Sequence, residues 1–220
     1  FVARWLSELM RRQDCTLARA NLQKFLLRNL LEARIRALRR QAVGKAYQQA
    51  FGDDAASRVA VTDQHPFEFH AQAYAPSRDY DGRFGHFDFC RHFYGRIGDF
   101  DSKEEFECAC WLDIQAQCGR VRFWVRNLVR REGCSFFLQK ADGRFYPDFL
   151  CQLPGSADQP GPILAVEYKG ADRWAGADDD RMIGGLWANL SAGRCRFVMV
   201  SDRRWEWIEE KLPPLSGGKY

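Results

Sequence analysis

Two stretches decide the fold: FYPDFL at residues 145–150 and ILAVEYKG at residues 163–170. Each is an apolar run of strand length that carries charged residues. Asp148 directly follows a proline, and Glu167 and Lys169 stand two residues apart. Since side chains alternate between the faces of a strand, Glu167 and Lys169 share one face and Tyr168 points away from it. Isolated charges on such strands are costly to bury, so the two stretches predict a functional site.

The composition is that of a globular protein. Of the 220 residues, 46% are hydrophobic and 28% charged, enough for one sizeable core or one core with a helical attachment. No apolar run approaches the ~18 residues of a membrane-spanning helix, so we expect no membrane partner. The chain begins at Phe1 rather than Met and shows no signal peptide. We therefore expect a piece of a longer protein whose upstream part holds some of the function.

The cysteines indicate a cytoplasmic protein. None of the eight forms a CxxC pair, and several, such as Cys151 and Cys195, lie in apolar runs. Reduced, buried thiols have this distribution, and secreted disulfide frameworks do not. His86, Cys90 and His92 match no zinc-ligand spacing, so a structural role is the preferred interpretation for them.

Charge is unevenly distributed along the chain. The net charge is +4, but residues 1–50 hold eleven Lys/Arg against three Asp/Glu, which makes +8 there and −4 in the remainder. Residues 1–55 are predicted to be a helical linker or docking segment, with one helix over 1–12 and another from about residue 14 to Ala50. Its basic surface can meet nucleic-acid phosphates. Alternatively, it is a solvated face or a docking surface for the upstream part.

Residues 56–220 are the second predicted domain, which opens with an aromatic, β-rich lead-in over 56–100. Short strands are predicted in the lead-in near 59–61, 67–69 and 84–94. Its aromatic side chains either fill the core or stack on bases. The four aromatic residues to which both alternatives apply are Tyr74, Tyr80, Phe87 and Phe93.

The rest of this domain alternates helices and strands. Helices are predicted over 101–117, 178–191 and 205–212. Strands are predicted over 121–126, 135–140, 144–152, 163–169 and 196–200, with an Asp-Gly hairpin turn at 142–143. The predicted fold class is α/β, a mixed central β-sheet flanked by helices, with an N-terminal helical segment.

The helix predicted over 101–117 brings a carboxylate inward. Glu105 lies on a face that is otherwise apolar, with Cys108, Ala109, Leu112 and Ala116. Glu107 lies on a neighbouring stripe and is the second choice, and Glu104 is the remaining acid of this turn. Alternatively, Glu105 is only a first-turn carboxylate that suits the helix dipole.

These residues suit phosphodiester hydrolysis, which needs a hard divalent cation, a positioned water and a positive group near the developing charge. Mg²⁺ prefers oxygen ligands and keeps several waters. Asp148, Glu167 and the backbone carbonyl of Tyr168 would suffice as ligands if the two strands are antiparallel neighbours. Lys169 would orient the attacking water or stabilise the transition state. Glu105 would contact the metal or one of its waters.

Asp148 after its proline, the triplet Glu167-Tyr168-Lys169 and a preceding helix glutamate together resemble the PD-(D/E)xK nuclease superfamily. Further blocks look like the C-terminal region of type III restriction enzyme Res subunits and related DEAD/DEAH helicase–nucleases. These blocks are EFECA (105–109), WVRN (124–127), FYPDF (145–149), VEYKG (166–170) and IGGLW (183–187). The resemblance covers roughly residues 84–200, and more loosely the N-terminal helices.

This resemblance implies a restriction-endonuclease-like fold and Mg²⁺-dependent endonucleolytic cleavage of double-stranded DNA, with Mn²⁺ as a substitute. It implies a bacterial or archaeal cytoplasmic protein of a restriction or antiphage system. It also implies an ATP-driven helicase upstream in the same protein and a methyltransferase or specificity subunit as partner. These residues contain no GxxxxGK[ST] loop, so ATP would act only through the upstream motor.

Three further residues are candidates for DNA binding. Arg126 and Asn127 end a predicted strand near the site, where they would contact DNA or else satisfy local backbone groups. Arg181 would contact a phosphate or pair with the aspartates 178–180. A rival hypothesis for the whole chain is a catalytically idle nuclease-like module that binds DNA or docks a subunit. RNA as the substrate is a third possibility.

Overall fold

The computed structural model describes residues 2–12, 16–50, 73–131, 133–140, 143–156 and 159–215. Contacts between Cα atoms divide the chain into two units, Phe1–Ala55 and Ala56–Tyr220. The strands predicted near 59–61 and 67–69 lie outside the described residues.

The first unit contains three helices: α1 (Val2–Arg12), α2 (Leu17–Leu22) and α3 (Lys24–Ala50). Thr16 caps α2 by accepting a hydrogen bond from the N–H of Arg19. The long helix predicted from about residue 14 is interrupted at Gln23, whose φ of −99° and ψ of 16° leave the helical region.

Apolar side chains of the first unit are exposed. Among the side chains that the structure describes in this unit, none is buried, and Phe25, Leu26 and Leu30 are 68%, 65% and 67% exposed. No helix within the described residues is both long enough and apolar enough to cross a membrane.

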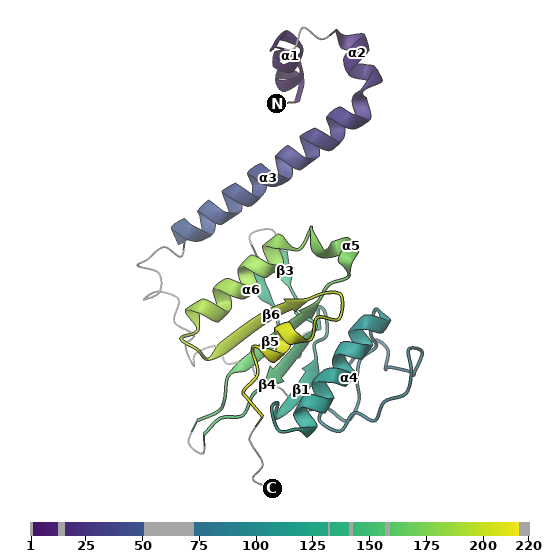
Figure 1. Ribbon diagram of the computed structural model, residues 1–220, viewed down its shortest axis with the longest axis vertical. Coiled ribbons are helices and arrows are strands. Elements are labelled where there is room, and N and C mark those ends of the chain that lie inside the picture. The colour runs from purple at the N-terminus through teal and green to yellow at the C-terminus, as the bar shows by residue number, and fades with distance from the viewer. Residues whose placement is uncertain are drawn as a thin grey trace. The chain divides into compact units, whose positions relative to one another are not determined.

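The second unit is built on a four-stranded sheet with the order β1-β4-β5-β6 (Figure 1). Its strands are β1 (Phe123–Arg126), β4 (Phe149–Gln152), β5 (Ile163–Tyr168) and β6 (Cys195–Val200). β4 is antiparallel to β1 and β5, whereas β5 and β6 are parallel. A parallel pair needs a crossover connection, and α5 (Ala171–Trp174) and α6 (Asp178–Leu190) lie in it. The predicted mixed central sheet is confirmed.

The strand predicted over 144–152 is divided between two sheets. β2 (Leu138–Lys140) and β3 (Gly143–Phe145) form a separate antiparallel pair, and β4 starts only at Phe149. Pro147 lies between β3 and β4, and a proline has no N–H to donate to a ladder. The chain therefore leaves one sheet and enters the other at Tyr146-Pro147-Asp148.

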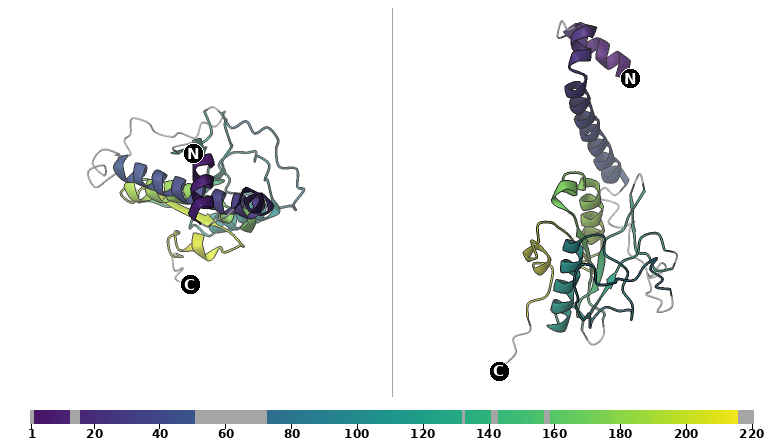
Figure 2. Two further views of the ribbon diagram at one scale, coloured as in Figure 1. Left: turned by 90° about the horizontal axis from the view of Figure 1, so that it is seen from above. Right: turned by 90° about the vertical axis from the view of Figure 1, so that its right-hand side faces the viewer.

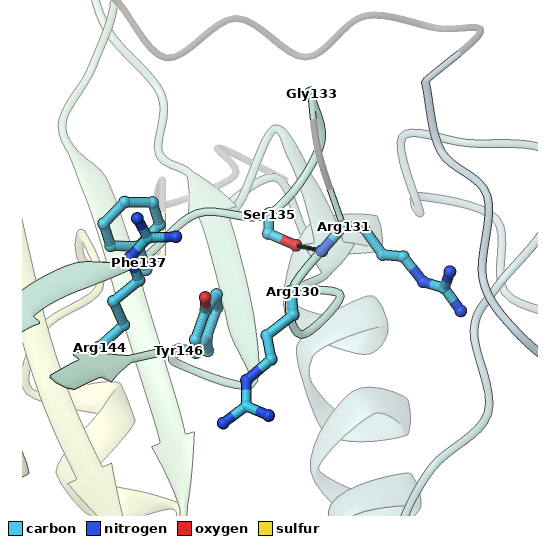
Figure 3. Close-up of a pocket in the computed structure, with 7 residues that line it drawn as sticks. All are labelled: Arg130, Arg131, Gly133, Ser135, Phe137, Arg144 and Tyr146. Atoms are coloured by element: carbon cyan, nitrogen blue, oxygen red, sulfur yellow. Dashed lines mark hydrogen bonds between the residues drawn. The ribbon is translucent and has the colours of Figure 1, made fainter.

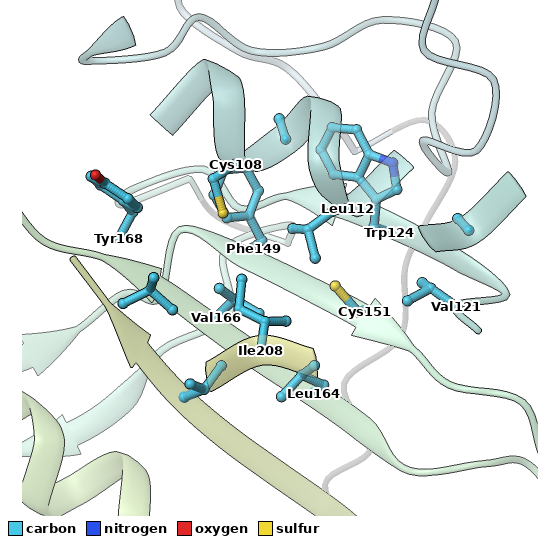
Figure 4. Packing of buried hydrophobic residues seen from close by; sticks show 14 of the residues in the cluster. Cys108, Leu112, Val121, Trp124, Phe149, Cys151, Leu164, Val166, Tyr168 and Ile208 are labelled. Atoms are coloured by element: carbon cyan, nitrogen blue, oxygen red, sulfur yellow. The ribbon is translucent and has the colours of Figure 1, made fainter. Parts of the chain in front are cut away.

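Helices flank the sheet (Figure 2). α4 (Lys103–Gln117) packs on β1 and β5, and the short α7 (Glu206–Glu209) packs on β6. Their side of the sheet holds the main core, including Leu112, Trp124 and Phe149, all 0% exposed (Figure 4). α6 lies on the other side, where a β-carbon on Gly184 would come within 2.5 Å of the Phe197 ring. Glycine thus permits the close approach of α6 to β6.

Residues 73–100 form no strand, so the predicted β-rich lead-in is wrong for this described part of it. Two isolated bridges, Asp79 with Gly98 and His92 with Trp124, replace the expected strands. The hydroxyl of Tyr74, a buried residue, donates to the Arg126 carbonyl at 2.9 Å and accepts from the N–H of Gly98 at 3.1 Å.

Most of the lead-in aromatics pack inward. Tyr74 belongs to a buried cluster, and Tyr80 and Phe87 pack against the main core. Phe93 is 41% exposed and lies against Phe123 with ring centroids 4.9 Å apart. This favours the interpretation that these residues fill the core.

Candidate active site

Asp148 and Glu167 lie opposite each other where β4 and β5 meet. The register pairs Phe149 with Val166, so Asp148 and Glu167 occupy the next position. The N–H of Asp148 donates to Glu167 Oε2 at 3.2 Å, and the N–H of Tyr168 donates to Asp148 Oδ2 at 2.8 Å. The predicted adjacency on antiparallel strands is confirmed. The Tyr168 ring lies in the main core, and the role of its carbonyl as a ligand stays a prediction.

Lys169 connects Glu167 to a third acid. Its Nζ lies 2.5 Å from Glu167 Oε1 and 3.6 Å from Oδ2 of Asp180 in α6. Asp180 is also 2.8 Å from Nζ of Lys140 in β2. Asp180 and Lys140 were missed in the sequence. The available signal for Asp180 was its place in an acidic turn after the Glu-x-Lys strand, whereas no pattern pointed to Lys140.

Arg126 lies between two carboxylates on the α4 side. Its Nη2 is 2.5 Å from Glu105 Oε1, and its Nη1 is 3.6 Å from Asp148 Oδ1. The second oxygen of Glu105 accepts from the N–H of Asp101 at 2.6 Å. Among the described residues, Nε of Arg126 is buried without a hydrogen-bond acceptor. Asp148 thus lies between two ion pairs, Glu105–Arg126 on the α4 side and Glu167–Lys169 on the other.

Of the three acids at the start of α4, Glu105 is the one directed at the site. Glu107 lies 2.6 Å from Arg203 Nε, and Glu104 lies 3.9 Å from Nη2 of the same residue. That arginine is half exposed, with 50% of its side-chain surface accessible. Glu105 is buried, as its apolar helix face predicts.

Arg126 and Asn127 are inside the fold, with exposures of 5% and 2%. Nδ2 of Asn127 donates to the carbonyls of Pro147 and Phe136 at 2.7 and 2.8 Å. The N–H of Arg126 donates to Nε2 of His92 at 3.0 Å. The predicted DNA contact therefore gives way to the alternative: both residues position the backbone around Asp148.

Arg181 is engaged within its own helix region. Its guanidinium pairs with Asp178, donates to the Trp174 carbonyl at 3.1 Å and lies 4.5 Å from the centre of the Trp174 ring. Two interpretations were open for Arg181, a contact with a phosphate or a pairing with an aspartate. The structure shows the pairing with an aspartate.

His92 has the structural role expected of it. Nε2 accepts the Arg126 N–H at 3.0 Å, so Nδ1 carries the proton and donates to the Tyr94 carbonyl at 2.9 Å. His86 lies instead 3.1 Å from Asp88 at the surface.

Burial raises the pKa of all three carboxyl groups. Burial, assisted by Asp148, raises the pKa of Glu105 to about 8. Burial and the neighbouring Glu167 raise the pKa of Asp148 to about 7, and burial raises the pKa of Glu167 to about 7 against the opposing effect of Lys169. The positive charges of Arg126 and Lys169 therefore do not offset the energetic cost of burying the three ionised carboxylates.

This donor set fits a divalent cation. Within the described part of the chain, no three Asp, Glu, His or Cys side chains converge on one point. Mg²⁺, however, is commonly held by one or two carboxylates and several waters. Asp148 and Glu167 supply two adjacent carboxylates with surplus negative charge, which is the chemistry that such an ion requires.

Neither a known protein family, nor a curated protein, nor a solved structure matches the chain. Any statement about function rests on the site itself.

Proposed function

We propose that the second unit is a metal-dependent nuclease domain, with a restriction-endonuclease-like fold, that hydrolyses DNA phosphodiester bonds. The observation that carries this proposal is the pairing of Asp148 with Glu167 across β4 and β5, with Lys169 Nζ 2.5 Å from Glu167. A helix, three antiparallel strands, a crossover helix and a parallel strand support this arrangement.

Asp148 and Glu167, with the Tyr168 carbonyl, would hold Mg²⁺, for which Mn²⁺ can substitute. When bound, the ion supplies Lewis-acid stabilisation and lowers the pKa of a bound water. Burial lowers the pKa of Lys169, but Glu167 and Asp180 outweigh it, and the net pKa is raised. Lys169 therefore stays protonated and acts by its charge, to orient water and stabilise the negative charge that develops on the phosphate.

Glu105 and Arg126 position Asp148 in this proposal. Arg126 contacts both carboxylates, and the Asp101 N–H fixes the orientation of Glu105. Glu105 would contact the ion or one of its waters once its carboxylate is no longer paired with Arg126 alone. The proposed setting, carried over from the resemblance, is double-stranded DNA cleavage coupled to an upstream ATP-driven helicase, with a methyltransferase or specificity subunit as partner.

A specific observation favours the alternative, an idle nuclease-like module for DNA binding or subunit docking. Each carboxylate already has a partner in the chain: Glu105 has Arg126, Glu167 has Lys169, and Asp148 accepts from the Tyr168 N–H. Carboxylates paired in this way can exist without an ion.

The two functions differ in a cleavage assay on supercoiled plasmid with Mg²⁺ or Mn²⁺. We expect Asp148→Asn and Glu167→Gln to abolish cleavage while the melting temperature is kept. Glu107→Gln is the matched control, because Glu107 belongs to the same helix as Glu105 but pairs with surface Arg203. If a folded Asp148→Ala/Glu167→Ala variant cut DNA as well as the parent, the proposal would be sunk. Salt-sensitive DNA binding without any divalent-ion binding would support the idle module.

A further inference from the structure

A cavity of about 700 Å³ is lined by Tyr146, which is two residues before Asp148 of the candidate active site. Its walls come from the loop after β1 and from the β2–β3 hairpin region (Figure 3). The lining residues that matter chemically are Arg130, Arg131, Ser135, Phe137, Arg144 and Tyr146. Nothing in the proposed cleavage chemistry uses them.

The described lining of the cavity is basic. Three arginines line it, and no acidic residue is among its described lining residues. None of the three guanidinium groups forms an ion pair with a described residue, in contrast to Arg126, which meets two carboxylates. Guanidinium groups that line a concave surface without an ion-pair partner among the described residues favour an anionic ligand, and their planar donors suit phosphate.

Aromatic rings form one wall of the cavity. The Arg144 guanidinium lies 4.2 Å from the centre of the Phe137 ring, and the Phe137 and Tyr146 ring centroids are 5.7 Å apart. In Figure 3, Tyr146 stands between the Phe137–Arg144 pair and the side chain of Arg130. Arginines interleaved with aromatic rings are the combination that binds a nucleic-acid strand, because every base has a face that can stack.

Two hydrogen bonds connect Arg131 and Ser135 in the loop that carries two of the arginines. Arg130 has a φ of +56°, in the left-handed region that non-glycine residues adopt only with backbone strain. The N–H of Arg131 donates to Ser135 Oγ at 2.6 Å, and the Ser135 N–H donates back to the Arg131 carbonyl at 3.0 Å. This strain persists because surrounding hydrogen bonds fix it, a pattern that often accompanies ligand binding.

The backbone segment that carries Tyr146 of the cavity also carries Asp148 of the candidate active site. Tyr146 is two residues before Asp148, so their Cα atoms are at most about 7 Å apart. Asn127 holds both sides: Nδ2 donates to the carbonyls of Pro147 and Phe136, and Oδ1 accepts from the Phe136 N–H at 3.0 Å.

From this geometry we infer that the cavity binds one nucleotide of a nucleic-acid strand next to the phosphate to be cleaved. Its base stacks on Tyr146, and its phosphate lies between the guanidinium groups of Arg130 and Arg144. The inference deepens the proposed function and rests on it for the role of the neighbouring carboxylates. It also moves the contact with the strand from the buried Arg126 and Asn127 to exposed arginines.

The test measures fluorescence anisotropy of a labelled single-stranded oligodeoxynucleotide with the 220-residue chain in EDTA, so that no cleavage occurs. We expect Arg130→Ala/Arg144→Ala to weaken binding at least about 10-fold and to reduce the salt slope by about 0.7, from one phosphate contact on a single strand. Tyr146→Ala should weaken binding by about 5- to 100-fold, whereas Tyr146→Phe should retain it. Arg122→Ala is the matched control, since Arg122 is exposed just before β1, at the end of that strand opposite Arg126.

A second arm separates stacking from charge. On an abasic oligonucleotide, Tyr146→Ala should bind like the parent, while the double arginine variant should still lose affinity. Equal binding by the pocket variants, the parent and Arg122→Ala would overturn the inference. So would an equal loss for Tyr146→Ala on intact and abasic strands, or a free mononucleotide that competes as well as the oligonucleotide.

The failure of this inference differs from the failure of the proposed function. If the pocket variants bound the strand as well as the parent and Mn²⁺-dependent cleavage were intact, the nucleotide pocket would be disproved and the nuclease proposal would stand. Pocket-dependent binding without any effect of Asp148 or Glu167 on cleavage would leave a nucleotide subsite in an idle module.

Discussion

Two acidic regions adjoin strand β1, one around Asp113 and one around Asp148, and their surroundings differ. Asp113 is 0% exposed, and its oxygens accept from the N–H of Arg91 at 2.9 Å and the indole N–H of Trp124 at 2.8 Å. Asp148 instead shares its surroundings with two further carboxyl groups and with cations. A single carboxylate held by neutral, fixed donors stabilises the fold. Crowded carboxylates with raised pKa values are the arrangement expected of a functional site.

The largest expected effect separates these regions by activity. Glu167→Gln should reduce Mn²⁺-dependent DNA cleavage by about 10³-fold or more, since metal stabilisation of the reacting charge contributes several kcal/mol. Its melting temperature should stay at or above the parent's, because one of the crowded carboxylates is removed. A cleavage time course with a thermal melt measures both. Retained cleavage, or a collapsed melting temperature, would show that Glu167 belongs with the structural acids.

Asp113→Ala should have the opposite profile. It leaves the buried indole N–H of Trp124 and three part-buried donors without an acceptor, at a cost of about 3 kcal/mol, or a melting temperature lower by roughly 6–12 °C. The Mn²⁺-induced rise in melting temperature should survive in this variant. Glu104→Ala, a half-exposed change in the same helix, should shift stability by no more than about 0.5 kcal/mol. A stable Asp113→Ala protein would contradict the structural assignment.

Divalent-ion binding should depend on pH. Burial raises the pKa of Asp148 and of Glu167 to about 7. The protonated groups therefore contribute to the stability of the fold. This contribution is fully present below the unfolded pKa near 4 and is lost as the pH rises through 7. An ion binds the deprotonated groups, so Mn²⁺ affinity at pH 6 should be on the order of 100-fold weaker than at pH 8.5. Isothermal titration at both pH values measures this. Equal affinities would count against these carboxylates as ligands.

The smallest effect concerns His92. Burial lowers the pKa of His92 to about 4, so its contribution to stability is full above the unfolded pKa of about 6.5 and is lost as pH falls from 6.5 towards 4. Between pH 6.5 and pH 5 the loss should be about 2 kcal/mol. Urea denaturation of the parent and of His92→Gln tests this, because the variant lacks that part of the pH dependence. Parallel stability curves for the two proteins would contradict it.

The centre of the site could be predicted from the sequence because local rules determine it. Strand alternation and antiparallel pairing bring Asp148 and Glu167 together, and an apolar helix face directs Glu105 inward. The role of these residues stays a prediction, since geometry alone does not establish catalysis.

The surroundings of the site could not be predicted, for two physical reasons. Arg126 and Asn127 are buried by residues 73–100 and by the turn before β4, and these segments have no periodicity. Asp180 meets Lys169 and Lys140 only through the packing of α6 and of a hairpin that leaves the central sheet at Pro147. Long-range packing, which a local pattern does not encode, decides both.

The central claim is that Asp148 and Glu167 together hold a divalent ion. The most direct measurement is anomalous diffraction from crystals of the protein soaked in Mn²⁺ above pH 8, where both carboxyl groups are deprotonated. The account predicts an anomalous peak between the carboxylates of Asp148 and Glu167, lost in Glu167→Gln and absent at Asp113. A fully soaked crystal with no peak there, or with its strongest peak elsewhere, would contradict it.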